Sequence, residues 1–289
     1  MICLTGDIHH SSLRTGNQQH CDIPETRVAA RYLRMLEEAR VHCTFFVSGR
    51  TFLEDWADLR LICESEWVEI GGHTWSCFEP AWVHRIAKKA CGSYNGPTWF
   101  QLLDVHRTRE IARRVSGRTI WSWRNHMYMH GKNTDKALAR CGIRFCSDSV
   151  QADALGPKWH PDGLFHFPIN VIPDHEHLYH AERTPLWVAN WRRRYGFCDD
   201  FGPESYYIDE WTDLVLDGLR RNEARGAVSN LIIHPITMYL CDGFRSFRRI
   251  LEFIASKKTV QMQWFWNRMP HAAENIEGSY GSQMPRVTP

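Results

Sequence analysis

The sequence lacks the features that direct a protein into a membrane, out of the cell or onto a nucleic acid. Its 289 residues contain no apolar run of about 18 residues, the length that crosses a bilayer. The N-terminus has no basic region followed by an apolar run and a small-residue cleavage site. The net charge is only +2, and the short arginine runs are more typical of solvated faces than of nucleic-acid surfaces. We therefore expect a cytoplasmic protein with no membrane span and no nucleic-acid partner; the oligomeric state stays open.

Paired cysteines are also missing. The ten cysteines are scattered along the chain without a CxxC motif, and a chain of this length buries a core without disulfide staples. Together with the lack of an export signal, this pattern predicts free thiols in a reducing compartment.

Tryptophan, in contrast, is abundant. The chain has thirteen tryptophans, whose flat faces can stack on sugar rings but also fill space in ordinary cores. Several fall in expected loops: Trp75, Trp82, Trp159, Trp187 and Trp191. These tryptophans support a sugar ligand but do not by themselves establish one.

Strand and helix patterns alternate along most of the chain. After a first strand within residues 1–10, apolar runs predict strands at 42–49, 67–70, 118–123, 143–146, 164–169, 231–233 and 259–265. Amphipathic spacing predicts intervening helices, among them 51–65, 98–115, 133–141, 206–222 and 244–256. Residues 170–202 are irregular and receive no element. Such alternation predicts a mostly parallel sheet covered by helices, and about seven strands suit either a barrel or a doubly wound sheet.

Polar, titratable residues stand where the predicted strands end. In βα barrels the carboxyl ends of the strands carry the active site. Five separate strands deliver such residues, which is hard to reconcile with chance capping: Asp7, His9, His73, Arg124, Asp148 and His234.

Two spacings indicate a metal site. Asp7 and His9 are two residues apart on a strand, so their side chains point into the same space. His73 and Cys77 are four apart, and a helical turn starting at His73 would bring them onto one face. Together with His9 they make three ligands of the types that zinc favours, with a fourth position left for water. The alternative reading is a capping histidine and a small buried cysteine.

The runs LTGDIH, CTFFVSG, EIGGHTWSC and LIIHP, in this order and spacing, resemble the polysaccharide deacetylase family, the NodB-homology proteins of carbohydrate esterase family 4. The resemblance covers roughly residues 1–265. It implies a single-domain, distorted (β/α) barrel of about seven mainly parallel strands at residues 1–270, followed by a tail at 271–289. It also implies hydrolysis of N-acetyl groups on amino sugars with a divalent metal held by one aspartate and two histidines.

Transferred residue by residue, the resemblance gives this chain an unusual metal set. His9 stands where a metal-binding aspartate is expected, His73 matches the first metal histidine, and Cys77 matches the second. Softer ligands of this kind favour zinc over harder cations. Another set remains open, because further histidines are available: His10, His175 and His177.

The resemblance also assigns four catalytic roles. Asp7 matches the catalytic base and Arg124 the arginine that orients it, although the sequence RNHMYMHG lacks the usual proline pattern. Asp148 and His234 match the pair in which the histidine is the general acid.

These residues predict a metal-dependent hydrolase that removes an N-acyl group, most simply N-acetyl, from an amino sugar or saccharide precursor, for example in cell-surface polysaccharide biosynthesis. Zinc is the expected cofactor. Two alternatives stay open: a related amidohydrolase acting on a small amide, and a metal-free sugar-binding protein that has lost catalysis.

Overall fold

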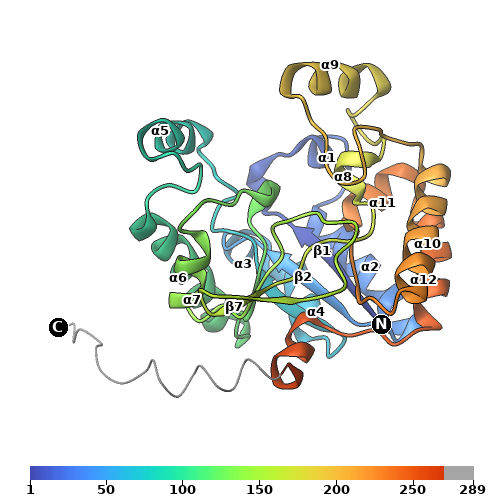
Figure 1. The fold of residues 1–289 in the computed structure, drawn as a ribbon, viewed down its shortest axis with the longest axis horizontal. Coiled ribbons are helices and arrows are strands. Elements are labelled where there is room, and N and C mark those ends of the chain that lie inside the picture. Colours follow the sequence, from blue (N-terminus) through green and yellow to red (C-terminus); the bar gives the residue numbers. More distant parts are fainter. Residues whose placement is uncertain (270–289) are drawn as a thin grey trace.

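Eight strands build one sheet in a computed structural model that describes residues 1–269. They are β1 (Ile2–Ile8), β2 (Cys43–Val47), β3 (Val68–Gly72), β4 (Ser122–Trp123), β5 (Phe145–Cys146), β6 (Lys158–His160), β7 (Leu164–His166) and β8 (Ser229–Ile232). Their order in the sheet is β6-β7-β5-β4-β3-β2-β1-β8, and only the β6–β7 pair is antiparallel. The sheet curls into a half-barrel (Figure 1), so the parallel strands end at one common rim.

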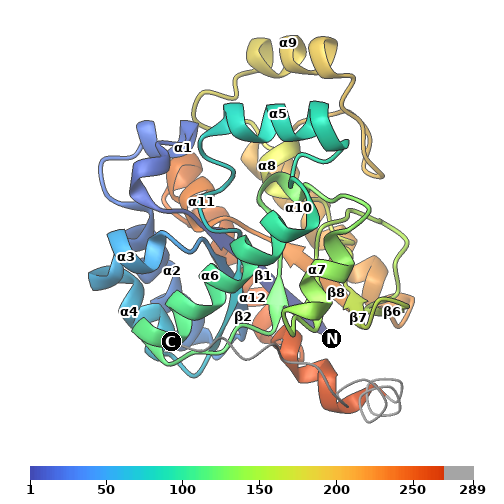
Figure 2. The same ribbon diagram turned by 90° about the vertical axis from the view of Figure 1, so that its left-hand side faces the viewer.

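Helices cover the outside of this sheet and one of its ends. They are α1 (Gly16–Gln19), α2 (Glu25–Ala39), α3 (Thr51–Glu54), α4 (Trp56–Glu64), α5 (Ala81–Cys91), α6 (Thr98–Ser116), α7 (Thr134–Arg140), α8 (Asp174–His177), α9 (Pro185–Tyr195), α10 (Ile208–Ala224), α11 (Pro235–Asp242) and α12 (Arg245–Ala255). Both ribbon views place α5, α8 and α9 at the end to which the strands point (Figures 1 and 2). Within residues 1–269, every helix is too short or too polar to span a bilayer.

Strand β1 separates an outer core from the barrel interior. Leu4 and Ile8 belong to the large apolar cluster between the sheet and the helices. Cys3 belongs to a second cluster, with Phe145, on the inner side. Asp7 is an even number of residues from Cys3, so it also faces inward. The register expected for Asp7 therefore follows from burial on both faces of β1.

Two buried asparagines close the gap between β8 and the segment that follows β7. The Asn230 backbone N–H donates to Asn170 Oδ1 at 2.8 Å, and Asn230 Nδ2 donates to the carbonyl of Phe167 at 2.8 Å. Asn170 Nδ2 in turn donates to the carbonyls of Ala154 and Val228, at 2.8 and 2.9 Å. Together with a backbone hydrogen bond of 3.2 Å from the Asn170 N–H to the Asn230 carbonyl, these side-chain amides bridge the place where the sheet does not close.

Two glycines bring β3 close to its neighbours. A Cβ on Gly72 would lie 2.3 Å from the Trp123 ring, and one on Gly71 would lie 2.6 Å from the Phe46 ring. Only glycine permits these approaches. The chain that leaves β3 at His73 is therefore held tightly against β4.

The structure confirms the predicted class, a distorted α/β barrel with mainly parallel strands. The predicted strand at 259–265 is wrong: Thr259 makes a single bridge to Ile2, and a 3₁₀ helix, Met262–Arg268, then packs under the barrel. The predicted helix at 51–65 is two helices, α3 and α4, that meet at Asp55. Residues 170–202, left without an element, contain α8 and α9. The predicted tail at 271–289 lies outside the described residues.

We predict that Asn170→Ala lowers the free energy of unfolding by about 3 kcal/mol, because it leaves the Asn230 N–H and two carbonyls buried without partners. Urea unfolding followed by circular dichroism measures the change. Asn190→Ala, at an exposed position of α9, is the matched control and should stay within about 0.5 kcal/mol of the wild type. Equal stability of the two variants would contradict this role for Asn170.

Candidate functional site

The carboxylate of Asp7 is fixed by the fully buried guanidinium of Arg124, which follows β4. Arg124 Nη1 donates to Asp7 Oδ1 at 3.0 Å. Its other N–H groups donate to Thr5 Oγ1 at 3.0 Å and to the hydroxyl and carbonyl of Ser147 at 2.8 and 3.0 Å. The guanidinium carbon lies 4.4 Å from the centroid of the Phe46 ring. Since the rigid fork has fixed partners, it holds Asp7 in one orientation.

The second oxygen of Asp7 faces two imidazoles. Asp7 Oδ2 lies 3.7 Å from His73 Nε2 and 3.6 Å from His234 Nε2. Burial would raise the pKa of Asp7, but His73 and Arg124 outweigh it and hold that pKa well below its usual range. Asp7 is therefore an anion at neutral pH with one oxygen turned toward the open site.

His234 is paired with Asp174, which lies in the segment 170–202, where the sequence predicts no helix or strand. Asp174 Oδ1 accepts from His234 Nδ1 at 2.7 Å, and Oδ2 accepts from the His234 backbone N–H at 2.7 Å. Burial would lower the pKa of His234, but the Asp174 carboxylate raises it well above its ordinary value. The ring is held as an imidazolium whose Nε2 points to Asp7.

The prediction that Asp148 holds His234 is therefore wrong. Asp148 instead accepts from the backbone N–H and the side-chain amide of Asn125, at 2.7 and 2.6 Å. His130 Nδ1 lies 2.9 Å from the same carboxylate. Asp148 does follow β5, as expected, but it anchors the loop that leaves β4.

Three imidazoles surround one point beside Asp7. The ring centroids of His9, His73 and His126 are 5.2, 5.1 and 5.3 Å apart in the three pairs, and the rings stand edge to face. The nitrogen donors of this triangle and the thiol of Cys77 all lie within 4.8 Å of one another. The structure thus brings together His9, His73 and Cys77, as the sequence predicts, and adds His126.

Hydrogen bonds orient two of these rings. His9 Nδ1 lies 2.9 Å from Glu25 Oε1, which also accepts from the His9 backbone N–H at 3.1 Å. His73 Nδ1 lies 2.8 Å from the carbonyl of Arg124. In both rings Nδ1 is engaged by the oxygen behind it, which leaves Nε2 as the nitrogen that could bind a metal, and a carboxylate behind a histidine is a common arrangement in metal sites.

Cys77 reaches the cluster through a loop rather than the expected helical turn. The backbone of Thr74, Cys77 and Phe78 has positive φ angles of 60°, 50° and 64°, which are unusual for these residue types. Burial raises the pKa of the Cys77 thiol well above its usual range, with a lesser opposing effect of a hydrogen bond with Ser48. Metal binding there would have to displace the thiol proton.

The alternative histidines do not join this cluster. His10 Nδ1 lies 2.9 Å from Ser48 Oγ. His177 Nε2 lies 3.0 Å from Asp199, and its Nδ1 lies 2.7 Å from a backbone carbonyl. The His175 ring instead lies tilted against the rings of His180 and His234, with centroids 5.4 and 5.7 Å away.

The donor set fits a divalent metal such as zinc. Burial lowers the pKa of His73 to about 4 and, with the neighbouring His9 and His73, lowers the pKa of His126 well below its ordinary value. Both rings are therefore neutral, as ligands must be. His73 Nε2 lies 3.2 Å from His126 Nδ1, which matches the separation of about 3.3 Å between two nitrogens of a tetrahedral zinc site.

Sequence reasoning missed three residues of this site. His126 follows Arg124 by two positions, so the search for titratable residues just after the predicted strands, which selected Arg124, would also have selected His126. Glu25 lies in the first turn of α2, where an acidic residue is common without any functional role. Asp174 lies in a stretch without periodicity, and no spacing connects it to His234.

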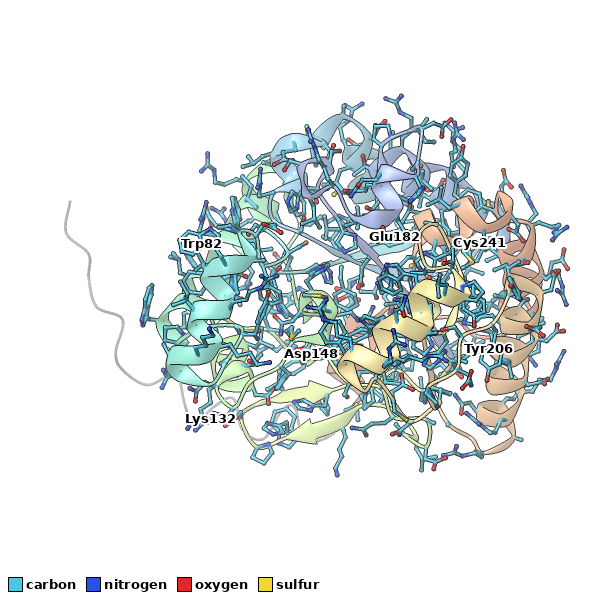
Figure 3. All side chains as sticks on the ribbon, turned by 90° about the horizontal axis from the view of Figure 1, so that it is seen from above. Trp82, Lys132, Asp148, Glu182, Tyr206 and Cys241 are labelled. Carbon is cyan, nitrogen blue, oxygen red and sulfur yellow. The ribbon has the colours of Figure 1, made fainter. Side chains whose placement is uncertain are left out.

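Aromatic residues lie around this end of the barrel. Trp82 on α5 is 64% exposed, and the Trp187 and Trp191 rings on α9 stack with centroids 6.1 Å apart. Figure 3 looks onto this end and shows Trp82 on α5 and Asp148 between α5 and α9 in projection. Two other tryptophans pack against side chains. The Trp75 ring centroid lies 3.9 Å from the guanidinium carbon of Arg107, and the ring centroids of Trp159 and Phe165 are 4.9 Å apart.

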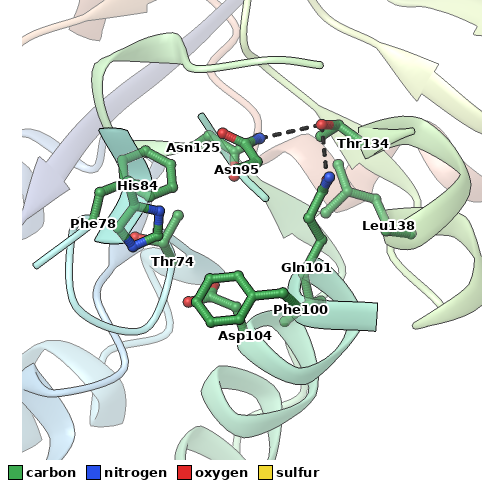
Figure 4. Close-up of a pocket in the computed structure, with 12 residues that line it drawn as sticks. Thr74, Phe78, His84, Asn95, Phe100, Gln101, Asp104, Asn125, Thr134 and Leu138 are labelled. Atoms are coloured by element: carbon green, nitrogen blue, oxygen red, sulfur yellow. Dashed lines mark hydrogen bonds between the residues drawn. The ribbon is translucent and has the colours of Figure 1, made fainter. Parts of the chain in front are cut away.

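A small cavity of about 20 Å³ lies behind the loop that carries Cys77, with room for about one ordered water molecule. Among the residues that line it, Asn95 Nδ2 donates to Thr134 Oγ1, which donates to Gln101 Oε1 (Figure 4). Its lining comes from the loop and from helices around it: Thr74, Phe78, His84, Asn95, Phe100, Gln101, Asp104, Val105, Asn125, Thr134, Ala137 and Leu138. None of the clustered imidazoles lines this cavity, so it is separate from the site.

Fold and site together define a barrel with a carboxylate, an imidazolium and a cluster of metal-ligand types at the carboxyl ends of its strands. The family model described as polysaccharide deacetylase matches residues 21–146. Among proteins of curated function, none matches the sequence. This match covers less than half of the chain and is consistent with a divergent member of the polysaccharide deacetylase family.

Solved structures share this fold at low sequence identity. A protein from Mycobacterium smegmatis assigned to the polysaccharide deacetylases has a TM-score of 0.63 at 19% identity, over 90% of this chain and 86% of its own. A protein from Pseudomonas aeruginosa PAO1 with the same assignment has a TM-score of 0.60 at 12% identity, over 93% and 92%. The Puue allantoinase has a TM-score of 0.60 at 13% identity, over 90% and 86%.

We predict that Glu25→Gln weakens metal binding by His9, His73, Cys77 and His126, the His9 cluster, by about 10–100-fold. The substitution removes the negative charge of the carboxylate behind the His9 ring. A cobalt(II) titration followed by the thiolate-to-cobalt absorption band reports only on an ion bound by a cysteine. Glu38→Gln, an exposed position on the same helix, is the control and should bind as the wild type does. Unchanged cobalt affinity in Glu25→Gln would rule out this supporting role.

Proposed function

We propose that this protein is a metal-dependent hydrolase that removes an N-acyl group, most simply N-acetyl, from an amino sugar or saccharide precursor. One observation carries the proposal: the anionic Asp7 stands between the His9 cluster and the imidazolium of His234. Two titratable groups whose surroundings drive their pKa values apart are the mark of an acid and a base in one site.

Asp7 is the general base of the proposed reaction. Its Oδ1 is engaged by Arg124, so only Oδ2 is free to take a proton from the attacking water. The charge of Arg124 keeps Asp7 ionised, and the fixed orientation removes the entropic cost of aiming it. Arg124 is a positioning residue, because it is fully buried and acts through its hydrogen bond to Asp7.

His234 is the general acid. Its Nε2 lies 3.6 Å from Asp7 Oδ2, on the side of Asp7 away from Arg124. When the amide C–N bond breaks, His234 gives its Nε2 proton to the departing amine, and Asp174 stabilises the imidazolium until then. The products are a free amine and an acid, and the proton count closes because Asp7 holds the proton lost by water.

His9, His73, Cys77 and His126 are the residues that would hold the metal. A divalent metal bound there would supply Lewis acidity to the acyl group and to water. The exposed Trp82 on α5 and the partly buried Trp187 and Trp191 on α9 give a sugar ring flat surfaces beside the site.

The two alternatives are separable by experiment. A small-amide hydrolase would use the same acid and base but would not need the saccharide. Because the Puue allantoinase shares this fold, small amides are included among the substrates to be tested. A metal-free binding protein would retain sugar affinity and release no acetate.

We predict that Asp7→Asn lowers kcat/KM by about 10²–10⁴-fold, the range expected for loss of a general base, while the bound metal is retained. Acetate release is measured over a panel of N-acetylated mono- and oligosaccharides and small amides, and metal content by mass spectrometry. Asp153→Asn, at a position whose side chain is 96% exposed, is the matched control. Near-normal turnover of Asp7→Asn would refute the assignment of the base.

We predict that Asp174→Asn moves the alkaline limb of the pH profile of kcat/KM to lower pH by about 1–3 units, the effect of removing an adjacent opposite charge. Activity needs protonated His234 and is lost as pH rises through its pKa, which Asp174 raises. Asp148→Asn should leave that limb in place because Asp148 does not contact His234. An unshifted limb in Asp174→Asn, or an equal shift in both variants, would disprove the acid assignment.

A further inference from the structure

A second group of metal-ligand side chains lies beside the proposed active site. It joins the loop after β4, helix α7 and the β6–β7 hairpin, and both ribbon views place α7 next to that hairpin (Figures 1 and 2). We propose that His130, Asp135 and His166 form a second binding site for a divalent transition-metal ion such as zinc. Nothing in the reaction proposed above uses these three side chains.

The three donors already converge. Asp135 Oδ1 lies 2.8 Å from His166 Nε2, and Asp135 Oδ2 lies 3.0 Å from His130 Nε2. One ligand atom from each of the three residues lies within 4.8 Å of the other two. Two imidazoles and one carboxylate with an open fourth position are a known zinc-ligand set, and small outward shifts of the rings would make room for the ion.

The groups behind the ligands also fit a metal site. Asp148, whose side chain is 4% exposed, lies 2.9 Å from His130 Nδ1, so His130 has a carboxylate behind it and its Nε2 turned to the ligand group. Burial would lower the pKa of His130, but hydrogen bonds with Asp135 and Asp148 raise it to about 10, so an ion bound there would have to displace the Nε2 proton. The His160 ring stacks on the His166 ring with centroids 4.5 Å apart and planes 4° apart. This stacking fixes the plane of His166.

The ligand group is accessible from solvent and connected to the first cluster. The side chains of His130 and His166 are 29% and 32% exposed, whereas that of Asp135 is 11% exposed. An ion could therefore enter without opening the fold. Asp148 also holds Asn125, the residue before His126, so an ion at this second site would tie down the loop that delivers His126 to the active site.

The test is the zinc content of four proteins after equilibration with buffered zinc, measured by mass spectrometry: the wild type, His166→Ala, His9→Ala/His126→Ala, and the variant that combines all three substitutions. If both sites bind, we expect about two, one, one and zero equivalents. His106→Ala, an exposed histidine on α6, is the matched control and should keep the wild-type count.

The result separates this proposal from the proposed function. If the His9 cluster holds no zinc, the wild type should still retain one equivalent of zinc, and His166→Ala should lose it. Because His166 is partly exposed, its variant should fold, and circular dichroism checks this. Zinc should raise the Tm of His9→Ala/His126→Ala but not that of the combined variant. An unchanged zinc count in folded His166→Ala, or no zinc in His9→Ala/His126→Ala, would overturn the second site and leave its contacts as an ion-pair network.

Discussion

The buried pair of Asp7 and Arg124 is the interaction on which the site depends. It joins β1 to the end of β4 across the inside of the barrel, where removing one partner would leave an uncompensated charge at a cost of about 3–5 kcal/mol. The hydroxyl of Thr5 and both oxygens of Ser147 satisfy the rest of the guanidinium. The same contacts that make the pair tolerable inside the fold also aim one carboxylate oxygen at the site.

The groups around that oxygen differ because their partners differ. Asp174 makes His234 an imidazolium, whereas a backbone carbonyl and burial make His73 a neutral ring. A carboxylate, that of Glu25, also stands behind His9. A common geometry, the carboxyl ends of parallel strands, thus supplies the positions, and the groups behind the rings orient each imidazole and, for His73 and His234, set its charge.

The sequence predicted what depends on strand registers and missed what depends on loops. Alternation along β1 placed Asp7 and His9 in one cavity, and the strand-end rule placed His73 and His234 on the same rim. The helical turn expected after His73 is instead a loop of positive φ angles, which hydrophobic spacing does not encode. The partner of His234 was assigned to the wrong aspartate because chain order cannot show which of several loops folds back over the rim.

The central claim is that the imidazoles of His9, His73 and His126, with the thiol of Cys77, bind one metal ion beside Asp7. Anomalous diffraction at the zinc edge, from crystals of the purified protein equilibrated with zinc, tests it most directly. We expect an anomalous peak inside the imidazole triangle, with zinc–nitrogen distances of about 2.0–2.1 Å. No peak within bonding distance of these rings in zinc-soaked crystals would contradict the account.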